Sequence, residues 1–215
     1  MNTKSTLTRS DYIKYLQKLT QYTSADEDFL ILHYFGAGED HLHNGIKRAY
    51  RDFSRTLRGF SKVHAKDHIR ETAVDALKQA LCALRDYPTG AVDQVIFDQW
   101  HQSTCLQLVD IFKEYNVHFY IGQAQQWINM TFKYIFTLGE NRIAGFGYFY
   151  PFCHVPLGNT LIPHLIKKGL PPLNCTWSKI DQYADYLAIQ KWVVNHFACL
   201  PMDVEFRSWL DNNLQ

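Results

Sequence analysis

Apolar residues recur at intervals of three and four along most of the chain, the spacing of one face of an α-helix. Between Asn44 and Gly59, Tyr50, Phe53 and Leu57 form such a stripe. Similar spacing, with capping and turn residues at the ends, predicts further helices over residues 10–19, 69–84, 91–97, 104–115, 123–138, 156–168, 177–197 and 201–210. Alternation with a period of two, which is typical of strands, is nearly absent. We therefore predict an all-α fold.

Length and composition favour one domain with a sizeable core. The 215 residues are 47% hydrophobic and 15% aromatic, and they contain no internal repeat. We expect one compact domain with two helical lobes, near residues 1–100 and 101–215, and a cleft between them. No run of about 18 apolar residues predicts a membrane span, and the polar start of the chain does not resemble a signal peptide. Five scattered cysteines favour reduced thiols and a cytoplasmic location.

Charge is unevenly distributed, although the formal net charge is only +1. Residues 47–70 contain eight Lys or Arg and two acids. Within this segment a second stripe at helical spacing contains Arg48, Arg51, Arg55, Arg58 and Lys62. Basic side chains at this spacing can neutralise successive phosphates, so we predict a nucleic-acid-binding surface. An acidic protein, another anionic surface or an ordinary solvated helix face are the alternatives.

A helix–turn–helix pattern spans Leu106 to Leu138. Its aromatic turn ends at Gly122, and Gln123 begins the second helix. A glycine before a helix lets backbone N–H groups approach a phosphate at the positive end of the helix dipole. We therefore expect Gly122 and Gln123 to contact a phosphate. Farther along, a segment from Cys153 to Asn159 leads into another helix.

This order resembles the helix-hairpin-helix DNA glycosylase superfamily, especially the archaeal 8-oxoguanine glycosylases and glycosylase-like proteins implicated in phage defence. The resemblance covers residues 100–170. It implies a hairpin that grips the DNA backbone, a lysine nucleophile a few residues after the hairpin glycine, and a Pro-x-Asp motif with a catalytic aspartate. In this chain Gln126 stands at the lysine position and Gly158 at the aspartate position.

These two departures predict a catalytically degenerate scaffold. No Asp or Glu occurs between Asn141 and Ile180, so this segment offers no carboxylate to stabilise positive charge on a sugar. We expect DNA containing a modified or damaged base to be the partner, with the base held by stacking and edge hydrogen bonds. The predicted pocket residues are Gln126, Trp127, Asn129, Tyr134 and Asn159.

Two alternatives stay open at the level of sequence. One is an active glycosylase or lyase with a relocated catalytic residue, for which Lys133 and Asp181 are the candidates. The other is a helical protein-interaction module without a nucleic-acid role. We expect no cofactor and no metal site, because the ten histidines include no HExxH motif and the His64/His68 pair lacks further ligands at suitable spacing.

Overall fold

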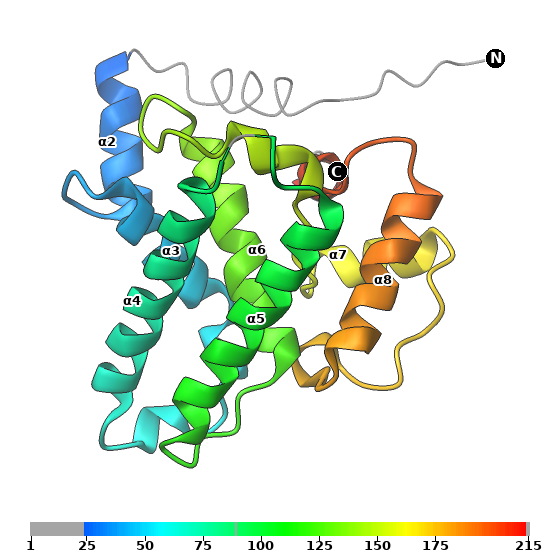
Figure 1. Cartoon of the computed structure of the whole chain (residues 1–215), viewed down its shortest axis with the longest axis horizontal. Helices are drawn as coiled ribbons and strands as arrows, with labels where there is room; N and C mark the ends of the chain where they lie inside the picture. Colours follow the sequence, from blue (N-terminus) through cyan, green and yellow to red (C-terminus); the bar gives the residue numbers. More distant parts are fainter. Residues whose placement is uncertain (1–23, 89, 214–215) are drawn as a thin grey trace.

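The computed structural model describes residues 24–88 and 90–213, and the helix predicted over residues 10–19 lies outside them. Within these ranges every regular element is helical and no strand occurs, so the all-α prediction is confirmed. The α-helices are α2 (Ser24–Phe35), α3 (His41–Phe53), α4 (Lys66–Arg85), α5 (Gln94–Lys113), α6 (Ile121–Leu138), α7 (Leu161–Lys167), α8 (Tyr183–His196) and α9 (Pro201–Asn213) (Figure 1). Four short 3₁₀ helices connect them: η1 (Ser54–Thr56), η2 (Phe60–Lys62), η3 (Gly147–Phe152) and η4 (Trp177–Lys179).

Helix α6 is the centre of the fold. All its residues except Thr137 are buried, and α3, α5, α8 and η4 pack against it (Figure 1). Its apolar stripe explains only part of this burial, because Gln123, Gln125, Gln126 and Asn129 are buried as well. A buried polar group is costly unless it has a hydrogen-bond partner. The partners of these side chains therefore separate structural positions from candidate binding positions.

Several helix boundaries differ from the prediction. The helix expected over residues 44–59 ends at Phe53, and η1 and a left-handed turn at Gly59 (φ 79°) follow it. The two helices expected over residues 91–97 and 104–115 are one helix, α5. Asp93 caps its first turn by accepting from the N–H of Ile96 at 2.8 Å. The prediction separated the two helices where polar residues such as His101 interrupt the apolar pattern. His101 is nevertheless buried, so its polarity does not mark the end of a helix.

The second half of the chain is less regular than predicted. Residues 156–160 precede α7 as a non-helical segment, and the long helix expected from Trp177 is η4 followed by α8. Buried apolar side chains from Phe35 to Leu210 form one cluster, so the two halves of the chain share a single core. None of the described helices combines the length and apolar character needed to cross a bilayer.

Candidate functional site

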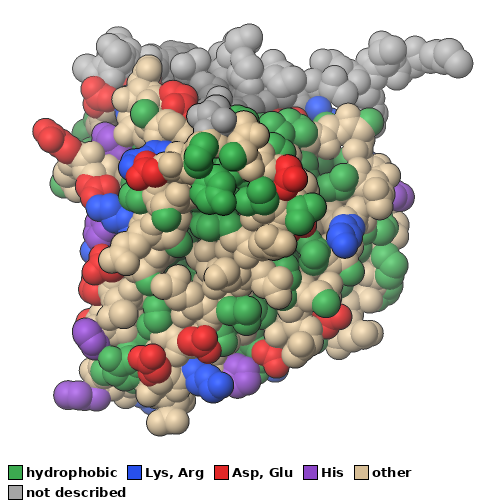
Figure 2. Space-filling model, viewed as in Figure 1, with side chains coloured by type: hydrophobic (Ala, Val, Ile, Leu, Met, Phe, Trp, Pro, Cys, Tyr) green, Lys and Arg blue, Asp and Glu red, His purple; other side chains and the backbone are tan. Residues whose placement is uncertain are grey.

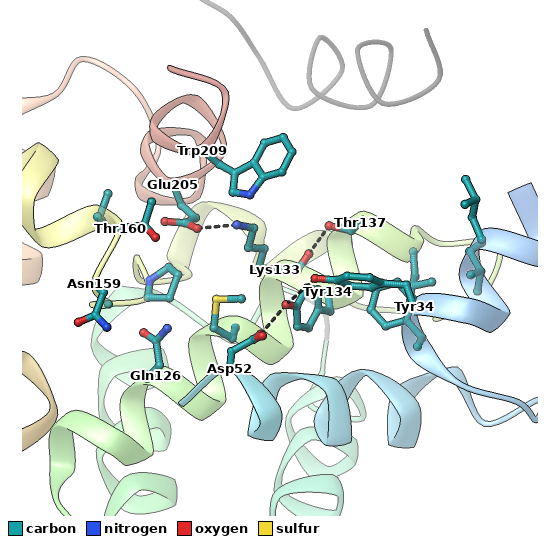
Figure 3. Close-up of a pocket in the computed structure, with 18 of the residues that line it drawn as sticks. Tyr34, Asp52, Gln126, Lys133, Tyr134, Thr137, Asn159, Thr160, Glu205 and Trp209 are labelled. Atoms are coloured by element: carbon teal, nitrogen blue, oxygen red, sulfur yellow. Dashed lines mark hydrogen bonds and ion pairs between the residues drawn. The ribbon is translucent and has the colours of Figure 1, made fainter. Parts of the chain in front are cut away.

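A cavity of about 700 Å³ lies between α2, the end of α3, the middle of α6, residues 156–161, η4 and α9 (Figure 3). The polar residues on its walls include Asp52, Gln126, Lys133, Tyr134 and Glu205. Their neighbours include apolar and aromatic side chains such as those of Met130, Leu161 and Trp177. A mostly apolar cavity of this size with a few placed polar groups is typical of small-ligand sites.

Gln126 is the most informative residue of the cavity. Its side chain is 7% exposed, and its Oε1 atom has no hydrogen-bond partner among the described residues. Gly158 lies directly opposite, because a Cβ on Gly158 would lie 2.9 Å from Gln126 Nε2. A buried amide without a partner costs about 1–3 kcal/mol. The two positions that the resemblance assigns to a catalytic lysine and aspartate thus lie next to each other on the wall of the cavity.

The carboxylates that line the cavity are all ion-paired. Glu205 Oε1 accepts from Lys133 Nζ at 2.5 Å, and the Lys133 and Glu205 side chains are only 6% and 10% exposed. Asp52 pairs with Arg48 at 2.7 Å and accepts from the Tyr134 hydroxyl at 2.5 Å (Figure 3). The third carboxylate, that of Glu27, has an oxygen 3.3 Å from Arg142 Nη1. The negative charge available to a reacting sugar is therefore largely compensated.

Tyr134 remains a neutral hydrogen-bond donor in this setting. Burial raises the pKa of its hydroxyl far above the usual range, and the charge of Asp52 adds to the effect. The Tyr34 hydroxyl lies 3.3 Å from that of Tyr134, and Arg48 donates to the Tyr34 hydroxyl at 2.8 Å. The Arg48 guanidinium also stacks 4.2 Å from the Tyr34 ring centroid. Arg48 is thus paired with side chains of the protein and only partly exposed, and its phosphate contact stays a prediction.

The remaining basic residues of the predicted stripe do not share one helix face. Because α3 ends at Phe53, only Arg51 lies in that helix, whereas Arg55 is in η1, Arg58 precedes Gly59, and Lys62 is in η2. All four side chains are exposed, and none forms an ion pair within residues 24–88 and 90–213. Arg55 also lines the cavity. On the face shown in Figure 2, Lys and Arg side chains are few, and those on the left and at the bottom lie next to Asp or Glu.

The start of α6 is not available to a phosphate. The Gly122 N–H donates to Ile180 O at 2.9 Å, and a Cβ on Gly122 would lie 1.9 Å from Trp177 O. Gln123 caps the helix by accepting from the Tyr120 N–H at 3.0 Å, and its Nε2 donates to Thr56. The expected phosphate contacts of Gly122 and Gln123 are therefore wrong. Close packing against η4 requires the glycine.

The predicted pocket residues divide into two groups. Gln126, Tyr134 and Asn159 line the cavity, and the Asn159 side chain accepts from Trp177 Nε1 at 2.7 Å. Trp127 does not line it, because its ring is fully buried and donates to Ile46 O at 3.0 Å. Asn129 faces the interior of the protein. These last two placements correct the prediction.

Asn129 belongs to a second cluster of buried polar groups, which the sequence did not reveal. Its Nδ2 lies within hydrogen-bond distance of Gln125, Val155 O and the Tyr186 hydroxyl, and its Oδ1 lies 3.1 Å from His101 Nε2. The cluster continues to His154, whose Nδ1 lies 2.8 Å from the Tyr186 hydroxyl and whose Nε2 lies 3.0 Å from Asp98. Its groups satisfy one another, so the cluster holds residues 153–157 against α6.

The two reserve catalytic candidates lie in different places. Lys133 lines the cavity, whereas the Asp181 side chain is 62% exposed and lies 4.0 Å from His118 on the surface. No group of three or more His, Cys, Asp or Glu side chains in the described part of the chain is arranged to hold a metal ion.

Comparison with protein-family models, with curated proteins and with solved structures gave no match to this chain. The likeness to DNA glycosylases therefore rests on the motif residues, and the candidate site rests on its own geometry.

Proposed function

We propose that this protein binds nucleic acid and holds one extruded base in the cavity without cleaving its glycosidic bond. The observation that carries the proposal is the buried amide oxygen of Gln126, which has no hydrogen-bond partner among the described residues. An amide offers one acceptor and two donors, which suits the mixed donor and acceptor edge of a nucleobase. Base-flipping proteins hold an extruded base by such edge contacts and by stacking.

The walls of the cavity support a planar, partly polar ligand. Trp177 and Tyr134 provide aromatic surface, and Met130 and Leu161 provide apolar surface. Figure 3 shows Gln126 and Asn159 at the lower left of the view, with the Lys133–Glu205 pair above them. A base that contacts Gln126 would thus lie among aromatic and aliphatic side chains, as stacking requires.

Binding without cleavage is supported by the chemistry of the same walls. Gln126 is not a nucleophile, and Gly158 carries no carboxylate. The Lys133 amine is ion-paired with Glu205, and Asp52 is ion-paired with Arg48. Glycosidic cleavage needs electrostatic stabilisation of positive charge on the sugar, which a compensated carboxylate supplies weakly.

The direct test is titration of labelled single-stranded and duplex DNA at two salt concentrations. We expect binding that weakens steeply with salt, and loss of binding when Arg55 and Arg58, two exposed cations beside the cavity, are changed to Glu, because these cations would contact phosphates. A duplex with one mismatch, whose base is extruded more easily, should bind more tightly than a matched duplex.

Gln126→Leu should remove that preference for the mismatch while the salt dependence stays unchanged. Gln107→Leu, the same change on the exposed surface of α5, is the matched control. Absence of DNA binding at low salt would refute the proposal and would favour the protein-interaction module.

An active glycosylase or lyase is the second candidate, and one observation favours it: Lys133 lies on the cavity wall. Base release by the wild-type protein would support this candidate over binding alone. Lys133→Arg keeps a cation for Glu205 but removes the primary amine, so it would abolish release if the amine acts as the nucleophile. A role in phage defence stays a prediction from the resemblance.

A further inference from the structure

A second hollow, of about 520 Å³, lies on the surface beside the cavity. It is formed by η1, η2 and the first turn of α4, together with Tyr50. The early end of α3 creates it. Because the chain leaves the helix at Phe53 and turns at Gly59 (φ 79°), basic residues that would have followed one helix face converge on a concave surface.

The charges in this hollow are strongly unbalanced. Its lining includes four basic residues, Arg55, Arg58, Lys66 and Arg70, and one acid, Asp67. Arg70 is neutralised by Asp67 and Glu71, each at 3.1 Å. The other three cations form no ion pair within the described ranges, and Lys66 Nζ donates only to Ser61 O at 3.3 Å. A concave surface concentrates the field of such charges and attracts an anion.

The hollow and the cavity are neighbours. Arg55, which lies in η1, lines both of them. A ligand with a planar group in the cavity and an anionic group beside it could thus contact both sites through Arg55. A nucleotide within a strand has this combination of parts.

We propose that the hollow binds a backbone phosphate of the strand whose base occupies the cavity, with Arg58 and Lys66 as ligands and Arg55 between the two sites. This assignment rests on the proposed function and adds to it. It adds Lys66 to the residues that contact nucleic acid. It also assigns a phosphate contact to Arg58 but not to Arg51 or Lys62, which lie outside the hollow.

The experiment compares two double variants of the full chain with the same change in charge. Arg58→Glu/Lys66→Glu alters the hollow, and Arg51→Glu/Lys62→Glu alters exposed cations outside it. The probes are a labelled single strand of about 20 nucleotides and its duplex, titrated over a range of salt concentrations. Circular dichroism and thermal melting verify the fold, and Arg58→Gln/Lys66→Gln repeats the test without adding negative charge.

We expect the hollow variant to bind at least about tenfold more weakly, and its log–log salt slope to become shallower by about two, one for each lost phosphate contact. The control pair should change affinity much less. Equal loss in both pairs would show a general charge effect and would overturn the assignment.

The two proposals fail in distinguishable ways. If the hollow variant binds like wild type while Gln126→Leu still loses the mismatch preference, the phosphate site is wrong and the base site stands. If wild type binds neither probe at low salt, both are wrong. Inorganic phosphate that competes with the probe only in proteins with an intact hollow would support the assignment independently.

Discussion

Two adjacent glutamines of α6 have opposite environments. The Gln125 Nε2 donates to Gly122 O at 2.8 Å and Leu157 O at 3.0 Å, and its Oε1 accepts from the Leu157 N–H at 3.1 Å. Gln126 is nearly as deeply buried, yet its Oε1 accepts no hydrogen bond from the described residues. The Gln125 side chain thus holds the segment of residues 153–157 against α6. The Gln126 side chain faces a cavity.

The difference shows that burial alone does not identify a site. A fully paired polar cluster, such as the one around Asn129 and His101, contributes to stability and to the uniqueness of the core. An unpaired group in a cavity lowers stability and is consistent with a role in binding. Changes in the two regions should therefore affect different measurements.

The largest effect on stability is expected at Lys133, which lines the cavity but is paired. Lys133→Met leaves Glu205 as a buried, uncompensated carboxylate and should lower the free energy of unfolding by about 3–5 kcal/mol in urea denaturation. Lys133→Met/Glu205→Leu removes both charges and should restore most of the loss. A small loss in the single variant would show that the pair is not important for the fold.

The next effect contrasts the two polar regions directly. Asn129→Leu removes hydrogen bonds to His101, Gln125 and Tyr186 and should cost about 3 kcal/mol, because several buried groups lose a partner. Gln126→Leu is a change of the same kind three residues earlier. It should leave the free energy of unfolding unchanged or slightly higher. Equal destabilisation by both would contradict the distinction between paired and unpaired amides.

A smaller difference is expected between two glycines. Gly122→Ala places a methyl group against the backbone of Trp177 and should cost about 2 kcal/mol through displacement of η4. Gly158→Ala meets only the flexible end of Gln126 and should cost much less, while altering ligand binding. Thermal melting and DNA titration of both variants measure the two effects. A Gly122→Ala variant that is as stable as wild type would show that η4 can shift at little cost in free energy.

Much of this arrangement could be predicted from local sequence, and the predictions that failed did so for one physical reason. The helical spacing predicted the all-α class. The resemblance singled out positions 126 and 158, which are in contact in the structure. The sequence could not predict that Gly122 packs against Trp177, because a glycine at a helix start suits either a phosphate or another backbone. Partners distant in the chain, such as Glu205 for Lys133, decide these roles.

The last contrast uses pH to isolate the paired cluster. Burial, with a further contribution from His154, holds the pKa of His101 well below its ordinary 6.5. Below pH 6.5 the unfolded chain therefore binds a proton at this residue and the folded protein does not. Stability should fall as pH drops from 6.5 towards 5, with a contribution of about 1.4 kcal/mol per pH unit from this one group.

Urea denaturation at several pH values measures this slope, and the comparison with His101→Gln assigns it. The window lies above the ordinary pKa values of Asp and Glu, 3.8 and 4.5, so carboxylates contribute little there. His164, whose pKa burial also lowers, adds a slope of the same sign that both proteins share. The variant should thus be less stable at pH 7 but lose stability more slowly on acidification. Equal slopes would show that His101 takes up a proton in the folded protein, which would contradict its placement as a neutral member of the buried cluster.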